Sequence, residues 1–215
     1  MALSRFPSDY LTTLSLKQTT RLDPEDVADI TLTLDDLWPL TALNLTLISI
    51  DLNLTIELRD SSLVEFVSSC QQLSILIVNE TFGWRAPGIT PAGLAQILQT
   101  CPSLSNLCIA LDTRGYTFPG QIQTGYAAAN AGSLSTLKIN VADSVIHTEG
   151  ILSLAGFFAD QMLGRGGRIF LGSWNMRHLD PESRIYKKRW ENVETLTDQV
   201  VLEPRRVDCS PVVSR

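Results

Sequence analysis

The side chains that could do chemistry are few, and their spacing argues against catalysis. His147 and His178 lie far apart in the sequence and form no HxxxH pair of the kind that binds a metal ion. The chain also has four cysteines, Cys70, Cys101, Cys108 and Cys209, and no CxxC pair. Because a structural zinc site needs closely spaced ligands, we expect no metal and interpret the cysteines as buried thiols in a reducing compartment.

One glycine-rich segment, GRGGR at residues 164–168, has the composition of a phosphate-binding loop. It follows an expected helix and precedes an expected strand, which is the reverse of the context that a phosphate loop needs, so we interpret it as a turn. The acidic residues Asp143, Glu149 and Asp160 have no partner at a useful spacing. Without a nucleophile elbow, Walker loop or dinucleotide motif, the sequence predicts neither enzyme activity nor a cofactor. An enzyme built on an α/β sheet is the least favoured alternative.

Residue types that protein interfaces favour gather after several expected strands. Aromatic and arginine side chains combine a large contact area with directional hydrogen bonds, and here they stand beside acidic ones. The candidate partner-binding residues are Glu80, Trp84, Arg85, Asp112, Arg114, Tyr116 and Trp174, together with the apolar strand residues Ile75 and Ile77. The alternative is that Trp84 and Phe82 only fill gaps between neighbouring loops, and that the strand residues form a solvated sheet face.

A repeat organises the elements that would position these residues. Five segments share the pattern LxxLxL with an aliphatic last residue: Leu11-Leu14-Leu16, Leu40-Leu43-Leu45, Leu73-Leu76-Val78, Leu104-Leu107-Ile109 and Leu134-Leu137-Ile139. A degenerate sixth copy follows at Arg168-Leu171-Ser173. In each copy the two closely spaced apolar residues share one face of a short strand. The pattern predicts strands near 14–16, 43–46, 75–79, 106–110, 136–140 and 169–173, with the alternate side chains, including Cys108 and Asn79, on the open face.

Between the strands the apolar period changes to that of a helix. The expected helical faces are Val27-Ile30-Leu34-Leu37, Leu63-Phe66-Val67-Cys70, Leu94-Ile97-Leu98-Cys101 and Ile151-Leu154-Ala155-Phe158. Asp23-Pro24 and Thr90-Pro91 provide N-caps followed by a proline, and Ser62 with Glu65 has the spacing of a capping box. Cys70 and Cys101 each precede a repeat leucine by three residues, so we expect them at equivalent helix ends.

We therefore predict an α/β fold, a leucine-rich-repeat-like solenoid with a curved parallel sheet and helices on the convex side. The solenoid spans residues 1–179, a capping helix 180–202 with the stripe Trp190, Val193, Leu196 and Val200, and a disordered tail 203–215. The repeats exceed the usual length of about 20–29 residues and lack the asparagine ladder. A doubly wound sheet is the rival, although its strands are usually apolar on both faces. The first strand has no comparable cap, so we expect its edge to self-associate.

The segment NETFGWRAPGITPAGLAQILQTCPSLSNLCIALDTRGYTF (Asn79–Phe118) resembles the leucine-rich regions of fungal, mushroom-type F-box-like proteins. The segments FPSDYLTTLSL and RWENVETL, at residues 6–16 and 189–196, are similar to that family as well. In such proteins an F-box binds a Skp adaptor of a cullin-type ubiquitin ligase, and the repeats recruit a target. The resemblance implies target recruitment here. A Skp contact is expected only for a longer form with an upstream F-box, since the chain begins close to its first expected strand.

Composition limits the partner classes. The 17 basic and 23 acidic residues give a net charge of −6, so we expect no nucleic-acid or membrane-surface partner. Without an apolar leader before Phe6, we expect a cytoplasmic or nuclear protein. The sequence favours a module that binds another protein, and the alternative is a structural or degenerate fragment without a specific partner.

Overall fold

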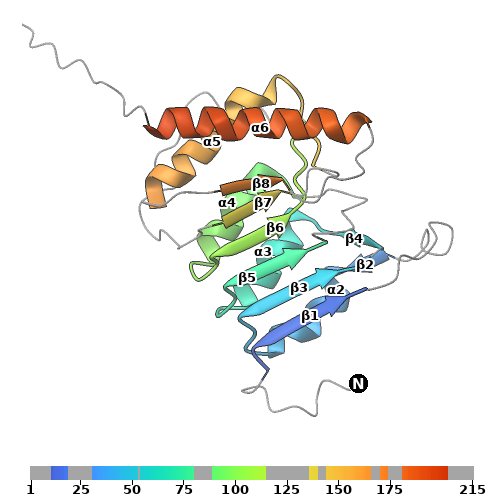
Figure 1. The fold of residues 1–215 in the computed structure, drawn as a ribbon. Helices are drawn as coiled ribbons and strands as arrows, with labels where there is room; N and C mark the ends of the chain where they lie inside the picture. Colours follow the sequence, from blue (N-terminus) through green and yellow to red (C-terminus); the bar gives the residue numbers. More distant parts are fainter. Residues whose placement is uncertain are drawn as a thin grey trace, which may run out of the picture.

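The architecture comes from a computed structural model, which describes residues 11–18, 31–52, 54–79, 89–114, 136–139, 144–165, 170–173 and 181–202. Its main sheet has six parallel strands in the order in which they occur along the chain (Figure 1). They are β1 (Thr13–Lys17), β3 (Leu47–Asp51), β5 (Ile75–Val78), β6 (Asn106–Ile109), β7 (Thr136–Ile139) and β8 (Phe170–Ser173). Every neighbouring pair is in parallel register.

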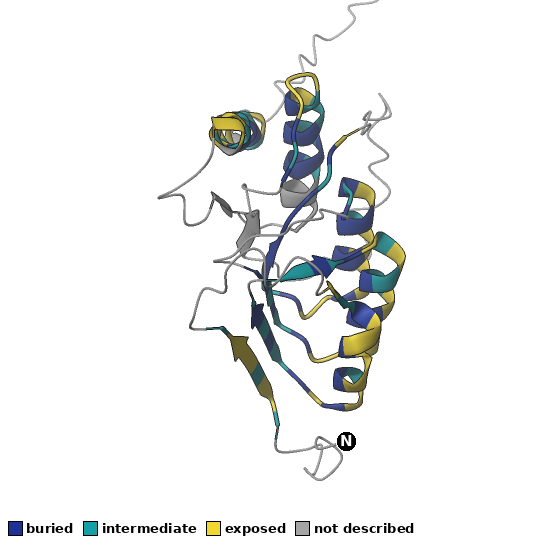
Figure 2. Ribbon diagram, turned by 90° about the vertical axis from the view of Figure 1, so that its right-hand side faces the viewer, coloured by how far each residue is buried: buried dark blue, intermediate teal, exposed yellow. Residues whose placement is uncertain are grey.

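The α/β fold with a parallel sheet is therefore confirmed, and five of the six strands lie where the repeat predicts them. The sheet is not curled, however, so the curvature expected of a solenoid is not seen. Figure 2 shows α3 (Asp60–Ser69) and α4 (Pro91–Thr100) together on one side of the strands. Their predicted apolar residues are all buried, and so are those of α5 (Gly150–Arg165).

The second strand was predicted in the wrong register. It begins at Leu47, and its residues Ile48 and Ile50 pair with Leu14 and Leu16 on one side. The second repeat is therefore Leu45-Ile48-Ile50 instead of Leu40-Leu43-Leu45. The segment contains two overlapping apolar patterns, and the earlier one falls on a 3-10 turn, η2 (Trp38–Ala42), which has a proline in its first turn. Leu40 and Leu43 are still buried, because η2 packs against α2 (Leu34–Leu37) and α3 and both leucines join the core.

The first expected helix is also wrong in part. Residues 31–33 form a strand, β2 (Thr31–Thr33), which pairs with β4 (Thr55–Glu57) in a separate two-stranded parallel sheet. Of the described part of this expected helix, α2 is helical, with Leu34 and Leu37 buried, and Val27 and Ile30 lie outside the described residues. β-branched threonines favour extended backbone, and a strand partner lies within reach after β3, so pairing replaces the helix. The expected start at Asp23-Pro24 lies outside the described residues.

Of the two predicted N-caps in the described residues, one is confirmed and one is wrong. The predicted cap at Thr90 is confirmed, because its side chain accepts a 3.2 Å hydrogen bond from the Gly93 amide at the start of α4. The predicted Ser62–Glu65 capping box is wrong, since α3 already begins at Asp60 and Arg59 is its N-cap. Cys70 and Cys101 occupy equivalent C-cap positions, as expected, and both are buried.

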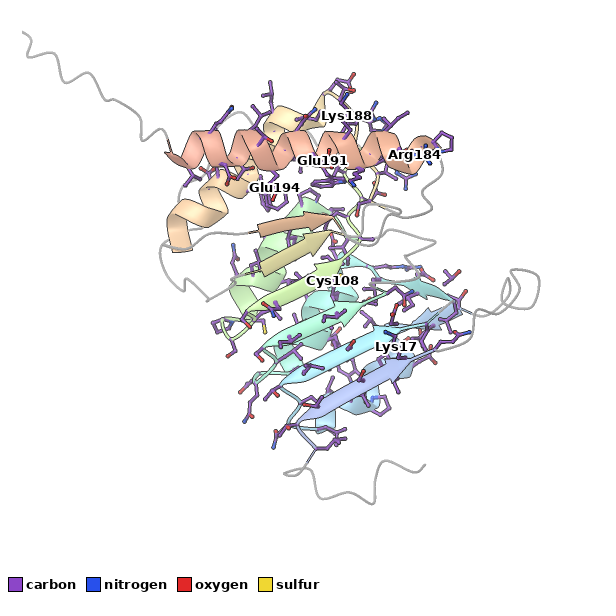
Figure 3. The ribbon with its side chains drawn as sticks, viewed as in Figure 1. Lys17, Cys108, Arg184, Lys188, Glu191 and Glu194 are labelled. Atoms are coloured by element: carbon purple, nitrogen blue, oxygen red, sulfur yellow. The ribbon has the colours of Figure 1, made fainter. Side chains whose placement is uncertain are left out.

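The alternation of the strands is clearest in β5, where Leu76 and Val78 are buried and Ile75 and Ile77 are half-buried. Three residues expected on the open face are buried instead: Asn79, Cys108 and Ala110. Cys108, labelled in Figure 3, is buried because its short side chain lies beside the longer Ile77, its register partner on β5. Asn79 is buried with a positive φ of 47°, and its side chain accepts a 2.9 Å hydrogen bond from the Leu52 amide.

The long helix α6 (Pro181–Leu202) packs against α5 and lies beside β8. Trp190 and Val193 are buried, and the Trp190 ring lies 6.3 Å from the Phe158 ring in an edge-on arrangement. The prediction that Val200 belongs to the same buried stripe is wrong, because Val200 is 50% exposed. Thr197 is buried instead, and its hydroxyl donates to the Val193 carbonyl at 2.7 Å, so its polarity is satisfied within the helix.

Candidate partner-binding site

The candidate site lies where β6 ends, and three chain segments meet there. The backbone after β6 pairs with its neighbours through isolated bridges between Ile89 and Leu111 and between Asp112 and Val145. The Leu111 amide also donates to the buried Ser144 hydroxyl at 2.9 Å. The carboxyl ends of parallel strands gather at one edge of a sheet. At that edge, these bonds hold the segment after β6 against the loop at residues 144–146.

Two side chains of helix α6 bond the loop at residues 144–146. The indole Nε1 of Trp190 donates to the Ser144 carbonyl at 3.1 Å, and Nη1 of Arg189 donates to the Ile146 carbonyl at 2.6 Å. These bonds use a carbonyl on each side of residue 145, so the first half of α6 lies over the loop. We use the name rim site for Asp112, Arg114, His147, Glu182 and Tyr186.

An ion pair between Asp112 and Arg114 forms the exposed part of the rim site. Arg114 Nη2 lies 2.7 Å from Asp112 Oδ2, and Arg114 Nε lies 3.0 Å from Asp112 Oδ1. The Arg114 amide donates to the same carboxylate at 2.9 Å, so the pair fixes both backbone and side chain. The Arg114 side chain remains 57% exposed and that of Asp112 20%. The guanidinium is therefore held in one orientation while it faces solvent.

The charges of the rim site act on one another. Partial burial alone would raise the pKa of Asp112, but the hydrogen bonds and charge of Arg114, with a contribution from His147, leave that pKa lowered. The pKa of Tyr186 is raised, first by the hydrogen bond that its hydroxyl donates to Glu182 and then by partial burial. The positive charges of Arg189 and Arg114 act in the opposite direction and lower the pKa of Tyr186 by a smaller amount. At neutral pH the site therefore presents a carboxylate, a guanidinium and a protonated phenol.

The structure locates only part of the predicted site. Asp112 and Arg114 lie at the rim as an ion pair, and Ile75 and Ile77 lie half-buried on the sheet. The remaining candidates fall outside the described residues: Glu80, Trp84, Arg85, Tyr116 and Trp174. Sequence reasoning missed His147, Glu182 and Tyr186. The Glu182–Tyr186 spacing of four residues was the available signal, because side chains at that spacing meet on a helix.

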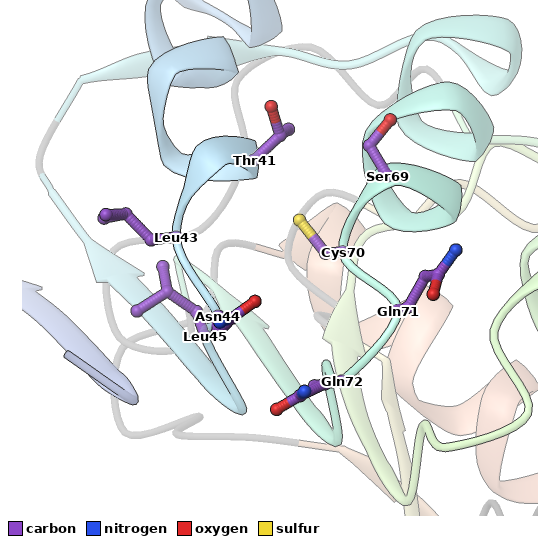
Figure 4. A pocket seen from close by; sticks show the side chains of 8 residues that line it. All are labelled: Thr41, Leu43, Asn44, Leu45, Ser69, Cys70, Gln71 and Gln72. Atoms are coloured by element: carbon purple, nitrogen blue, oxygen red, sulfur yellow. The ribbon is translucent and has the colours of Figure 1, made fainter. Parts of the chain in front are cut away.

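A small hollow lies at the other edge of the sheet, where the strands begin (Figure 4). Its volume is about 140 Å³, and the residues that line it are Thr41, Leu43, Asn44, Leu45, Ser69, Cys70, Gln71 and Gln72. Burial, and to a smaller degree the neighbouring Cys101, raise the pKa of the Cys70 thiol to about 11. Because the thiolate is the reactive form, Cys70 is unsuited to act as a nucleophile at neutral pH.

Two other classes of site have no support in the described part of the chain. Within it, no three His, Cys, Asp or Glu side chains gather in a way that could hold a metal ion. None of its helices is long and apolar enough to cross a membrane. Comparisons of the chain with family models, curated proteins and solved structures find no match.

Proposed function

We propose that this chain is a protein-binding module, without catalytic activity or cofactor, that contacts its partner through the rim site. The observation that carries the proposal is the Arg114 guanidinium, which is 57% exposed yet held by Asp112 at 2.7 Å. A group fixed before binding loses little side-chain entropy when it forms an interface. Arginine and tyrosine are also the residue types that contribute most often to interface energy.

The repeats support a more specific form of this proposal. In the main sheet the six strands lie side by side in the order in which they occur along the chain, as expected if the units are those of a leucine-rich-repeat-like solenoid. With the resemblance to fungal F-box-like proteins, this leads us to propose target recruitment for a ubiquitin ligase in the cytoplasm or nucleus. Contact with a Skp adaptor is proposed only for a longer form that carries an F-box. The alternative functions are a fragment without a specific partner and, least favoured, an α/β-sheet enzyme.

The proposal is tested by affinity capture with three forms of the chain, followed by mass spectrometry. Wild type is compared with Arg114→Ala and with Arg59→Ala as the matched control. Arg59 is also an exposed arginine paired with a carboxylate two residues away, Glu57, but it lies at the start of α3. A partner bound at the rim should be lost with Arg114→Ala and retained with Arg59→Ala.

The captured partner is then titrated against the purified forms. We expect Arg114→Ala to weaken binding by about 1–2 kcal/mol, or about 5- to 30-fold, while the unfolding midpoint stays near that of wild type. If Arg114→Ala and Arg59→Ala bind the partner with equal affinity, the partner binds elsewhere than at the rim site. Cullin and Skp proteins among the captured set favour the ligase form of the proposal, a single unrelated target favours a simple binding module, and no reproducible partner favours the fragment.

A further inference from the structure

One exposed stripe of α6 carries charge of both signs, separated along its length. Five residues at alternating spacings of four and three lie on one face of the helix, and all five are exposed: Arg184, Lys188, Glu191, Thr195 and Asp198. This is the spacing that brings residues of one helix into line along a neighbouring helix. Figure 3 shows Arg184 and Lys188 toward the start of α6 and Glu191 and Glu194 farther along it.

This charge order is unfavourable for an isolated helix. The amino end of a helix carries partial positive charge and its carboxyl end partial negative charge, so basic residues at the start and acidic residues at the end oppose the helix dipole. The acidic half also repels itself, because Asp198 and Glu191 add to the effect of burial in raising the pKa of Glu194. The arrangement is favourable only beside a partner with the opposite order of charge.

A second copy of the same helix, turned end to end, has that opposite order. We propose that α6 pairs antiparallel with α6 of a second copy of this chain, forming a symmetric dimer. When Lys188 lies opposite Asp198 of the second copy, Arg184 lies beside the negative end of the second helix. The same register places Glu191 opposite Thr195 of the second copy, so the two copies of Glu191 do not meet.

The stripe is separate from the rim site. Tyr186, a residue of the rim site, and Arg189, which bonds the Ile146 carbonyl, lie on other sides of α6. Lys187 is already paired with Glu191 within the helix at 3.8 Å. Helix α6 has 22 residues, so it is about 33 Å long. One helix pair of this length falls at the small end of specific interfaces, and we expect a dissociation constant of about 10–100 μM that rises with salt.

The test uses the full chain and two charge-reversed variants in sedimentation equilibrium. Arg184→Glu with Lys188→Glu makes the stripe wholly acidic, and Glu191→Lys with Asp198→Lys makes it wholly basic. Each variant alone should be monomeric at concentrations where wild type is dimeric, because like stripes repel. An equimolar mixture should form a heterodimer. Both reversals improve the match to the helix dipole, which offsets the loss of the exposed Lys187–Glu191 pair in the second variant. Their unfolding midpoints should therefore stay at or above that of wild type.

The matched control is Lys17→Glu with Arg59→Glu, which makes the same charge change as the first variant at an exposed residue of β1 and at the exposed N-cap of α3. It should leave the dimer intact. The proposal is overturned if wild type is monomeric well above the expected dissociation constant, if either reversed variant alone dimerises like wild type, or if the mixture stays monomeric. Loss of association in the control alone would also overturn it, because the contact would then lie at β1 or at the start of α3.

Discussion

At the scale of single residues, one carboxylate joins two successive repeats. Asp60 opens α3 and accepts hydrogen bonds from the Thr90 amide at 2.8 Å and from the Thr90 hydroxyl at 2.6 Å. Thr90 in turn caps α4, so the start of one helix holds the start of the next. The sequence predicts Thr90 as a cap from its local pattern. It gives no sign of Asp60, which lies 30 residues earlier, because such a contact exists only once the repeats stack.

A substitution at Gly93 tests this contact between Asp60 and Thr90. A Cβ at that position would lie 2.1 Å from Asp60 Oδ1, so Gly93→Ala must displace the carboxylate from Thr90. We expect the substitution to lower the free energy of unfolding by about 1–3 kcal/mol in urea denaturation, because two partly buried hydrogen bonds are lost. The control is Gly156→Ala in α5, where the added Cβ would meet nothing within 4 Å apart from the adjoining backbone of its own helix. That change should stabilise by about 0.5–1 kcal/mol.

A double-mutant cycle separates the two contributions at Gly93. Once Asp60→Ala has removed the carboxylate, Gly93→Ala should cost little or should stabilise the helix, as an alanine normally does. An unchanged cost of Gly93→Ala in the Asp60→Ala background would show that the clash is with something other than the inter-repeat cap.

At the scale of elements, sequence periodicity was sufficient where a pattern was local and unique. It predicted β5, β6 and α4 because their apolar residues fit one period only. It misplaced β3, where two overlapping patterns compete, and missed the pairing of β2 with β4, which joins residues far apart in the chain. The site follows the same division. Asp112 and Arg114 are close in sequence, whereas His147 comes near them through the bridge between Asp112 and Val145, and Tyr186 through the packing of α6.

Helix α6 also predicts how stability depends on pH. The pKa of Glu194 is raised by partial burial and by the charges of Asp198 and Glu191, so folding disfavours its ionised form. Stability is therefore lost as the pH rises through this raised pKa. We expect Glu194→Gln to raise the free energy of unfolding at neutral pH. The gain should disappear below the unfolded-state pKa, where the glutamate is protonated in both states.

Denaturant unfolding at several pH values measures this effect. The control is Glu65→Gln on the exposed face of α3, which should change stability by less than about 0.5 kcal/mol. If Glu194→Gln destabilises at neutral pH, then a favourable contact of the carboxylate outweighs the burial and repulsion described here.

At the scale of the whole molecule, the two ends of the sheet differ. Helix α6 lies beside β8 at one end, while β1 lies at the other (Figure 1). Leu16 is 41% exposed, although its register partner Ile50 on β3 is fully buried. Among the described strands β1 pairs with β3 alone. An end strand with apolar residues and an open edge is a template for pairing with another chain.

We therefore expect assemblies larger than a dimer as the concentration rises, since the contacts through α6 and through β1 lie at opposite ends and can form together. Lysines at Thr13 and Ser15, both exposed in β1, should suppress the larger species and leave the dimer through α6. Lysines at Ser61 and Ser68, exposed on α3, should change neither. Light scattering over a concentration series measures the species present. Amide exchange reports on the same edge: strong protection at Leu14 in a dilute, monomeric sample would show that the edge is already covered and that β1 does not drive assembly.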